Sequence, residues 1–494
     1  MWGFCMEIKK YKEILNHLKA IIAGSEFGNH LFAVGGCCRD FIMGNEIKDI
    51  DLCIDLPSGG IRFAEWMEKN HFTFGSVVTY PTYGTAMFKF ASFPDVEIEC
   101  VQTRKEQYHD ESSRNPETAY GTLEEDAFRR DLTINAIYFN ISQESLLDVT
   151  GKGLADIKKH IIRVTSTPDI VYSDDPLRIL RCVRFFSRFH GESTDWYIEE
   201  TTLKGMYFNV DRLSIITKER IADELNKMLL CKDPVCAMKL LKDIGAMKYV
   251  IPELEETFGM KQNKYHFGTV FEHTLKVLDN VTNDCLYYGA FNNNDKLALR
   301  MAALLHDIGK IKTRTVDENG NVHFYQHELA SVGLCETILR RLKYSNEFIK
   351  EVQFLVKNHM RTKNWGDDCS HMKDKSLRKF QYECGNATNY AMLLSLIDAD
   401  NKAHAPEYCF NNQCHLIDDR TAEMIEEITD MFGYRLPIDG NDVMAIKGLK
   451  PGREVKECLD YALKLAFNNP KIDKETLLKH IKGYKVKNEK SVGG

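Results

Sequence analysis

Residues 34–40 read VGGCCRD, and residues 48–55 read KDIDLCID. In the first stretch an apolar run enters a double glycine, and a polar turn follows. In the second stretch two carboxylates, Asp49 and Asp51, stand one residue apart in a segment typical of a β-strand. Because side chains alternate along a strand, both carboxylates point to one face. Carboxylates near glycines, which let a backbone approach closely, predict a site for Mg²⁺ and a triphosphate and suggest nucleotidyl transfer.

Length and composition describe a large globular protein. A chain of 494 residues is too long for one core and should divide into about three or four domains. With 44% hydrophobic and 28% charged residues, the composition is that of a soluble protein. No apolar run approaches the about 20 residues that span a bilayer, and residues 1–7 lack the pattern of a signal peptide. We therefore expect no membrane association.

Cysteine usage and charge give two further expectations. The 15 cysteines are scattered, odd in number and include no C-x-x-C, which favours reduced thiols and a cytoplasmic protein. The net charge of −7 argues against a uniformly basic coat, but local basic patches can still bind nucleic acid. The lysine-rich segment 471–490 is either such a patch or a solvated helical tail.

Hydrophobic periodicity changes from strand-like to helical along the chain. The expected strands are residues 31–36, 50–54, 86–90, 97–101 and 134–141, and residues 108–121 are expected to form a mobile loop. Helical patterns follow from about 156 to 259, from 270 to 403, and from about 418 onward, after a polar break at 406–413. Ser173-Asp174-Asp175-Pro176 is a helix start signal, with Pro176 at the first helical position.

Three more acidic or basic groups fit the carboxylate site. Either Glu97 or Glu99, which alternate with apolar residues, could join the two aspartates, although an edge strand with a solvated acidic face explains them as well. The pair Arg130 and Asp131 could hold triphosphate and ribose, since arginine donates paired hydrogen bonds to phosphate. Further along, Asp175 and Arg178 share a helical face and offer acceptors and donors suited to a nucleobase, unless the aspartate is simply the N-cap. Arg181, Arg184 and Arg188 follow at helical spacing.

The ordered set of motifs resembles a known family. GGxxRD, DxD, RRDLTINA, DDPLRILR and ERIxxEL follow one another between about residues 30 and 260. This order is similar to that of the class II tRNA nucleotidyltransferases, which are the CCA-adding enzymes and their poly(A) polymerase kin. The chain departs from the family pattern at Cys38, where valine is usual, and at Asp174, where glutamate is usual.

The resemblance implies a role for each matched position. Asp49, Asp51 and Glu99 would be catalytic, with the two aspartates holding Mg²⁺. The residues that would bind the incoming CTP or ATP are Gly35, Gly36, Arg39, Arg130, Asp131, Asp175, Arg178 and Arg181. The protein would then add the 3′-terminal CCA of tRNA by two-metal transfer without a nucleic-acid template.

A second group of metal-ligand residues follows. Adjacent His306 and Asp307 stand in the apolar run LLHDIG, and the ordered set resembles the HD phosphohydrolase superfamily. The resemblance implies one divalent metal, of the transition-metal class, on His273, His306, Asp307 and Asp400. His327 and His359 would complete a second site. A phosphodiesterase or phosphatase would result, unless the metal is structural. His404, Cys409, Cys414 and His415 lack the close ligand pair of structural zinc.

These expectations combine into one architecture. We expect an α+β chain with a nucleotidyltransferase head and a small mixed sheet over 1–155. A helical neck over 156–262, an HD domain over 263–405 and a helical tail over 406–494, where tRNA could be contacted, would follow. The alternatives are a poly(A) polymerase, a partial enzyme that adds only CC or only A, or an HD phosphohydrolase whose head merely binds RNA.

Overall fold

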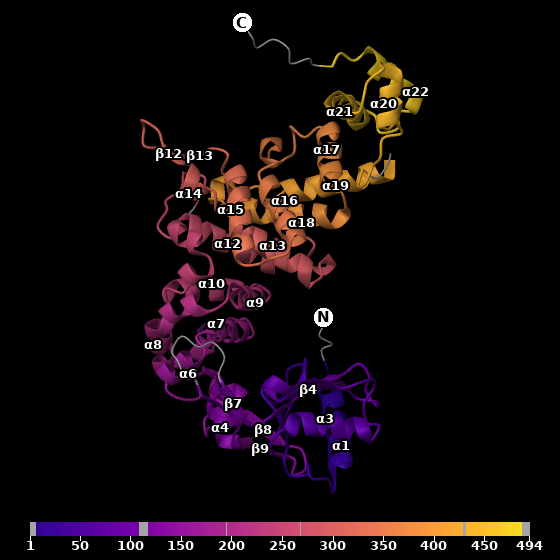
Figure 1. Ribbon diagram of the computed structural model, residues 1–494. Coiled ribbons are helices and arrows are strands. Elements are labelled where there is room, and N and C mark those ends of the chain that lie inside the picture. Colours follow the sequence, from indigo (N-terminus) through magenta and orange to yellow (C-terminus); the bar gives the residue numbers. More distant parts are fainter. Residues whose placement is uncertain (1–5, 108–116, 194, 267, 428–430, 487–494) are drawn as a thin grey trace. The chain divides into compact units, whose positions relative to one another are not determined.

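A computed structural model describes residues 6–107, 117–193, 195–266, 268–427 and 431–486 of the chain (Figure 1). The chain divides into two compact units, Met1–Pro252 and Glu253–Gly494. The finer division into four domains stays a prediction.

The N-terminal unit is built on a seven-stranded mixed sheet. Strand β2 pairs in parallel with β5, and the other neighbours pair antiparallel. In spatial order the strands are β3 (Val78–Tyr80), β4 (Thr85–Lys89), β5 (Glu97–Gln102), β2 (Ile50–Ile54), β1 (Leu31–Val34), β8 (Ile137–Asn140) and β9 (Ser145–Asp148). The predicted α+β class with a mixed sheet is therefore confirmed. Each predicted strand lies in this sheet, although β8 begins only at Ile137 because a 3₁₀ turn (Thr133–Asn135) precedes it.

Helices pack against this sheet. They are α2 (Gly36–Met43), which contacts β1, β2 and β8, and α3 (Gly59–Lys69). Helix α1 (Ile8–Ile22) precedes the first strand in the chain. Helix α3 contacts β4, β5 and β2. At Gly60 an added Cβ would lie 2.7 Å from the carbonyl oxygens of Cys100 and Gly84. The helix can therefore approach the strands this closely only because residue 60 has no side chain.

One segment differs from the sequence-based expectation. Residues 117–120, predicted as loop, form strand β7 (Glu117–Tyr120), which pairs antiparallel with β6 (Arg104–Gln107). The non-local backbone pairing, for example of Arg104 with Tyr120, outweighs the polar composition of the segment. Residues 108–116 of the expected loop lie outside the described residues.

Helices dominate the rest of the N-terminal unit. They are α4 (Leu123–Phe128), α5 (Gly153–Lys159), α6 (Pro168–Asp174), α7 (Leu177–His190), α8 (Glu200–Asn209), α9 (Lys218–Leu229), α10 (Pro234–Asp243) and α11 (Met247–Val250). A short parallel pair, β10 (Ile161–Ile162) with β11 (Tyr197–Ile198), interrupts them. The predicted start signal at residues 173–176 separates α6 from α7. Pro176, predicted as the first helical residue, is instead the N-cap of α7, because the helix begins at Leu177. The carboxylate of Asp175 accepts a hydrogen bond from the N–H of Leu177 at 3.1 Å.

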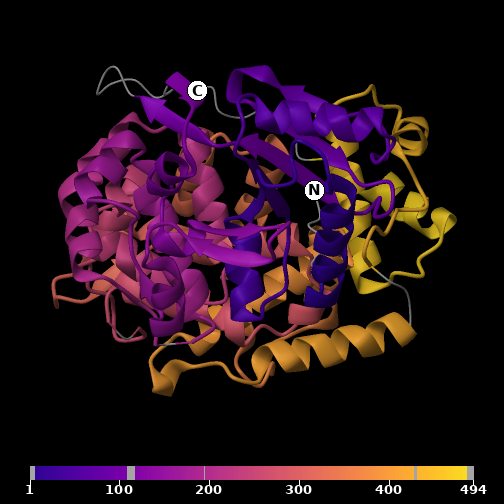
Figure 2. The same ribbon diagram turned by 90° about the horizontal axis from the view of Figure 1, so that it is seen from below.

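The C-terminal unit is almost entirely helical. Its elements are α12 (Val270–Asn283), α13 (Asn293–Leu305), α14 (Lys310–Thr313), the hairpin β12 (Arg314–Val316) and β13 (Val322–Phe324), α15 (His327–Arg341), α16 (Asn346–Asn358), α17 (Asp374–Cys384), α18 (Ala387–Lys402), α19 (Gln413–Glu427), α20 (Gly440–Lys447), α21 (Arg453–Asn468) and α22 (Lys474–Gly483). Helices α12, α13, α16 and α18 pack together, and α19 is one unbroken helix (Figure 2). Among the described residues, no helix has the length and apolarity needed to cross a bilayer.

The close approach at Gly60 allows a test of how α3 packs against the sheet. Gly60→Ala should destabilise α3 and β5 by about 1–3 kcal/mol, because its methyl group overlaps backbone oxygens that cannot rotate away. Faster hydrogen exchange in peptides from α3 and β5 would report this loss. Gly333→Ala is the control, since Gly333 is an exposed residue of α15 with open space around it. Equal exchange in Gly60→Ala and the wild type would contradict the packing argument.

Candidate active sites

The predicted carboxylates lie on neighbouring parallel strands. Asp51 of β2 stands in register with Glu99 of β5, so their side chains share one face of the sheet. Asp49 is exposed and precedes β2 by one residue, while Asp51 is half-buried and Glu99 is exposed. The structure thus brings Glu99 of the two candidate glutamates directly beside Asp51.

Burial, together with neighbouring negative charge, raises the pKa of these acids. Burial, followed by the negative charge of Glu99, raises the pKa of Asp51 to about 6. Burial and then the charge of Asp49 also raise the pKa of Glu99, against the opposing effect of Arg104. A divalent cation would relieve this repulsion, so the carboxylates fit a hard metal ion.

A pocket of about 340 Å³ opens beside the two aspartates. Six of its side chains are cationic and four are acidic, namely Lys48, Arg39, Arg130, Arg181, Arg184 and Arg188 against Asp40, Asp49, Asp51 and Asp131. The predicted glycine turn forms one wall: Gly35 has φ 76°, and a Cβ there would lie 3.7 Å from Asp51 Oδ2 and 3.6 Å from Arg130 Nη1. The excess of positive charge suits a polyanion such as a triphosphate.

Buried acids orient the arginines of this pocket. Arg39, itself buried, donates from Nε and Nη2 to Asp40 at 3.0 and 2.8 Å. Arg181 Nε donates to Asp131 Oδ2 at 2.8 Å. Burial tends to raise the pKa of Asp131, but the neighbouring Arg181 cation lowers it well below its usual range. These ion pairs hold the guanidinium planes in place before any ligand binds.

Asp126 is the support that sequence reasoning missed. Its fully buried carboxylate accepts hydrogen bonds from Arg130 Nε at 3.2 Å and from the Tyr138 hydroxyl at 2.6 Å, and it also pairs with Arg129. The signal was present in the sequence DAFRRD, where an acid stands four residues before the second arginine. An acid and arginines at that spacing are more often an exposed salt bridge, so only the structure reveals the burial.

The two residues expected to read a nucleobase have other partners here. The Asp175 carboxylate accepts hydrogen bonds from the N–H of Leu177 at 3.1 Å and from Arg220 Nη2 at 2.7 Å. Arg178 is buried and donates from Nη2 to the carbonyl oxygen of Arg129 at 2.7 Å. Their role in base selection stays a prediction.

A second centre gathers all the predicted HD residues in the C-terminal unit. The capping box of Thr269 and Glu272 starts α12 and turns His273 to the buried side. His273 Nε2 lies 3.0 Å from Asp400 Oδ1 and 3.3 Å from His306 Nε2. On the other side of Asp307 stand His327, with Nε2 3.1 Å from Asp307 Oδ1, and His359.

The histidines of this centre are all oriented in the same way. Their Nδ1 atoms contact backbone carbonyl oxygens at 2.6–3.2 Å, those of Ala403, Ala303, Phe324 and Val356 for His273, His306, His327 and His359 respectively. An N–H at Nδ1 leaves the lone pair on Nε2, and the Nε2 atoms face the two aspartates. This outer-shell arrangement is typical of metal-ligating imidazoles.

The chemistry of the donor set fits one or two divalent metal ions. His273, His306 and Asp307 form one group of potential ligands, and Asp307, His327 and His359 form another, so Asp307 is shared. Asp307 Oδ2 is buried and accepts no hydrogen bond among the described residues, although Lys310 Nζ lies 2.6 Å away. Burial lowers the pKa of His359 to about 3 and also lowers that of His273, which keeps both imidazoles neutral and able to bind metal.

A pocket of about 410 Å³ leads to this centre. It adds residues that sequence reasoning did not assign: His266, Lys310, Lys363 and the aromatic rim formed by Tyr265, Phe324, Tyr325, Tyr408 and Phe410. His404 also lies here, with Nε2 2.6 Å from Lys363 Nζ. Among the described residues, the groups close enough to hold a metal do not include Cys409, Cys414 or His415.

Family models match three successive parts of the chain. The poly(A) polymerase head domain matches residues 31–163, the probable RNA-binding region of poly(A) polymerase matches 197–258, and the HD domain matches 270–401. Fold and site therefore define a poly(A) polymerase-type head joined to an HD domain. Over these residues the chain is similar to the tRNA nucleotidyltransferases and poly(A) polymerases.

Curated proteins are similar to this chain in sequence, and solved structures are similar to it in fold. The chain is 34% identical over 238 residues to tRNA nucleotidyltransferase cca1 of Schizosaccharomyces pombe, covering 45% of each chain. It is 27% identical over 430 residues to the A-adding tRNA nucleotidyltransferase of Deinococcus radiodurans, covering 86% of this chain and 89% of that one. The apo form II structure of a CCA-adding enzyme shares the fold, with a TM-score of 0.64, 19% identity and coverage of 96% and 95%. The chain spans less than half the length of the yeast relatives that it matches.

The raised pKa of Asp51 predicts a stability gain when its charge is removed. An acid whose pKa is about 6 when folded and near 4 when unfolded destabilises the metal-free fold above pH 6, and this effect vanishes below about pH 4. Asp51→Asn should therefore stabilise the chain in chelator by about 1–3 kcal/mol at pH 7.5. Urea unfolding at pH 7.5 and pH 4 measures it. Glu97→Gln, on the exposed strand position two residues before Glu99, is the control. A gain that is equal at both pH values would refute the electrostatic cause.

Proposed function

We propose that this protein is a tRNA nucleotidyltransferase that adds or repairs the 3′-terminal CCA of tRNA from CTP and ATP without a nucleic-acid template. The observation that carries the proposal is the placement of Asp51 beside Glu99, at the edge of an arginine-rich pocket walled by Gly35. A binding module has no need of crowded carboxylates, whose mutual repulsion is useful only when a cation joins them. This argues against a head that merely binds RNA.

We assign Asp49, Asp51 and Glu99 as the residues that hold Mg²⁺. Bound there, two Mg²⁺ ions would favour ionisation of the primer 3′-hydroxyl and neutralise charge on the departing pyrophosphate. The chain itself positions the substrates. Arg39, Arg130 and Arg181 line the space for the triphosphate, and Gly35 and Gly36 allow it to approach the backbone. Asp131, which also lines this pocket, is assigned to accept a hydrogen bond from the ribose.

Base selection is assigned to Asp175 and Arg178 at the start of α7. In the present structure both are engaged elsewhere, Asp175 with Arg220 and Arg178 with backbone carbonyls. Reading CTP or ATP would require them to exchange these partners for the pairing edge of the base. The described cysteines are all free thiols, in keeping with our proposal that the enzyme works in the reducing cytoplasm.

A primer assay tests the proposal and separates it from its alternatives. With tRNA lacking its last three nucleotides, CTP and ATP, the wild type should add C, C and A and then stop. Asp49→Ala and Asp51→Ala should lower the rate by at least about 10³-fold, because removing a metal ligand removes charge stabilisation worth several kcal/mol. Glu97→Gln should add nucleotides at the wild-type rate. Growth of an A tract would identify a poly(A) polymerase, and addition of only CC or only A a partial enzyme. Normal turnover of both alanine variants would refute the site.

For the HD centre we propose a metal-dependent phosphohydrolase, either a phosphodiesterase or a phosphatase. This proposal rests on the imidazole Nε2 atoms, which converge on Asp307 and Asp400. The adjoining pocket contains Lys310 and Lys363. Two lysines at the mouth of a metal centre suit a phosphate ester. Bound metal would supply a hydroxide nucleophile, and a transition metal suits the imidazole-rich ligands better than Mg²⁺ does.

The HD proposal predicts two separable activities. His306→Ala and Asp307→Asn should abolish metal-dependent hydrolysis of phosphate esters, because each removes a ligand, while CCA addition continues at the wild-type rate. Hydrolysis of p-nitrophenyl phosphate and of bis-p-nitrophenyl phosphate with Mn²⁺, Co²⁺ or Ni²⁺ distinguishes phosphatase from phosphodiesterase. His323→Ala is the control, since His323 lines the pocket but is paired with Asp317 on the hairpin. If metal binds but neither ester is hydrolysed, the metal is structural.

A further inference from the structure

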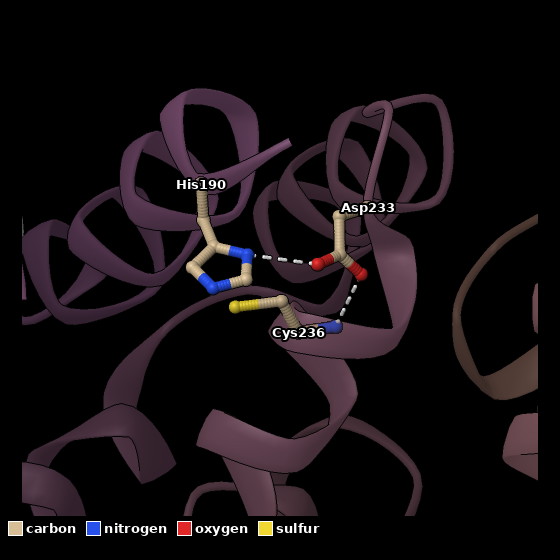
Figure 3. A group of neighbouring side chains, drawn as sticks. All are labelled: His190, Asp233 and Cys236. Carbon is tan, nitrogen blue, oxygen red and sulfur yellow. Dashed lines mark hydrogen bonds and ion pairs between the residues drawn. The ribbon is translucent and has the colours of Figure 1, made fainter. Parts of the chain in front are cut away.

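Three potential metal ligands of different chemistry meet in the N-terminal unit, apart from either proposed active site. They are His190, the last residue of α7, Asp233, which caps α10, and Cys236 in the first turn of α10 (Figure 3). One nitrogen of His190, one carboxylate oxygen of Asp233 and Sγ of Cys236 lie within 4.8 Å of one another. Residues more than 40 positions apart in the sequence thus converge on one point.

The backbone holds this cluster together. Ser187 Oγ donates to the carbonyl oxygen of Asp233 at 2.6 Å, which fastens Asp233 to α7. Gly191 follows His190, and an added Cβ there would lie 2.7 Å from Lys232 Cβ and 3.0 Å from Asp233 N. Because only glycine leaves this space, the end of α7 can approach the start of α10 closely. The fold therefore brings the backbone positions of the three residues together before any ion binds.

The hydrogen bonds within the cluster leave two donor atoms available. Asp233 Oδ2 lies 2.9 Å from His190 Nδ1, and Asp233 Oδ1 accepts from the N–H of Cys236 at 2.9 Å. A proton on Nδ1 leaves the lone pair on Nε2, and Figure 3 shows Nε2 and the Cys236 sulfur on the same side of the ring. Neither Nε2 nor Sγ has a hydrogen-bond partner among the described residues. A carboxylate that orients a histidine in this way is the usual outer support of a metal-bound imidazole.

We propose that His190, Asp233 and Cys236 form a binding site for a zinc-like divalent cation. His190 Nε2 and Cys236 Sγ would be the direct ligands, and Asp233 would orient the imidazole from the other side of the ring. Imidazole nitrogen and thiolate sulfur are ligands of tetrahedral Zn²⁺, whereas Mg²⁺ avoids sulfur. The side chains of His190 and Asp233 are 31% and 30% exposed, so an ion can enter and water can complete the coordination. Burial and then the Asp233 charge raise the pKa of the Cys236 thiol to about 12. Binding therefore releases the thiol proton to solvent as the sulfur–metal bond forms.

The site would fasten the end of the helix that supplies the head pocket. Helix α7 carries Arg181, Arg184 and Arg188, which line that pocket, and Arg188 Nη2 donates to Asp40 at 3.1 Å. A cation bound between His190 and Cys236 would join α7 to α10 at the end of α7 nearest Arg188. Its role is thus structural and separate from catalysis by the carboxylates.

Cobalt titration of the full-length chain tests the site, because Co²⁺ bound to thiolate gives a sulfur-to-metal charge-transfer absorption. The HD ligands are nitrogen and oxygen atoms, so metal in that centre gives no such band. We expect the band in the wild type, its displacement by Zn²⁺ and its loss in Cys236→Ser. Cys285→Ser, which removes a half-buried thiol of the C-terminal unit, should keep the band. Asp233→Asn should weaken binding by about 10–100-fold through loss of the orienting carboxylate. Absence of the band, or its persistence in Cys236→Ser, would overturn the proposal.

A second measurement does not depend on how well the serine variant folds. The rate at which iodoacetamide alkylates Cys236 in the wild type, followed by mass spectrometry, should fall when Zn²⁺ is added, because a metal-bound sulfur is a poorer nucleophile. In His190→Ala the same Zn²⁺ should have little effect. An alkylation rate at Cys236 that zinc leaves unchanged would show that His190 and Asp233 only join two helix ends.

Discussion

The parallel pairing of β2 with β5 is the constraint on which the head site depends. Its register sets Asp51 beside Glu99, and the chain then brings Asp49 in from the residue before β2. Such a placement costs free energy in the absence of a ligand, as the raised pKa values of Asp51 and Glu99 indicate. The folded structure tolerates this repulsion because burial of the neighbouring hydrophobic strand residues stabilises the sheet. Ile50, Leu52 and Cys100, for example, are completely buried. The core thus holds the acids in an arrangement that they would not adopt alone.

The arginines of the pocket show the opposite electrostatic design. Each of Arg39, Arg130 and Arg181 is paired with a buried or nearly buried acid, so its charge is already oriented and partly desolvated. A paired guanidinium still has free N–H groups, and it can contact an anionic ligand without first losing side-chain freedom. Carboxylates that lack a cation and arginines that already have anions together make a site prepared for a metal and a polyphosphate. The HD centre is also arranged in advance, since contacts with backbone carbonyls fix its imidazoles.

Local sequence patterns predicted much of the fold and of the two sites. The features that they missed depend on contacts between residues far apart in the sequence. Alternating apolar residues located β2 and β5, and the histidine and aspartate positions of the HD centre all lie where the ordered motifs placed them. Strand β7 was missed because it owes its conformation to pairing with β6 rather than to its own composition. Asp126 looked like a surface acid, since sequence cannot reveal that Tyr138 and Arg130 enclose it. His266 and His404 were missed as parts of the HD pocket because they come from segments between helices, where no periodicity indicates which way a side chain points.

Helix α7 shows most directly how sequence pattern and core packing determine the geometry of the head pocket. Its apolar face, including Ile179, Leu180 and Val183, is fully buried, which fixes the rotation of the helix about its axis. With that rotation set, the 3.6-residue period turns Arg181, Arg184 and Arg188 toward the pocket. The same helix begins at Leu177, whose N–H donates to Asp175, and ends at His190, so both of its ends are tied by side chains from elsewhere in the unit. Any shift of α7 along its axis would move three pocket arginines at once. The geometry of the triphosphate space is therefore determined as much by the two ends of this helix as by the sheet that carries the carboxylates.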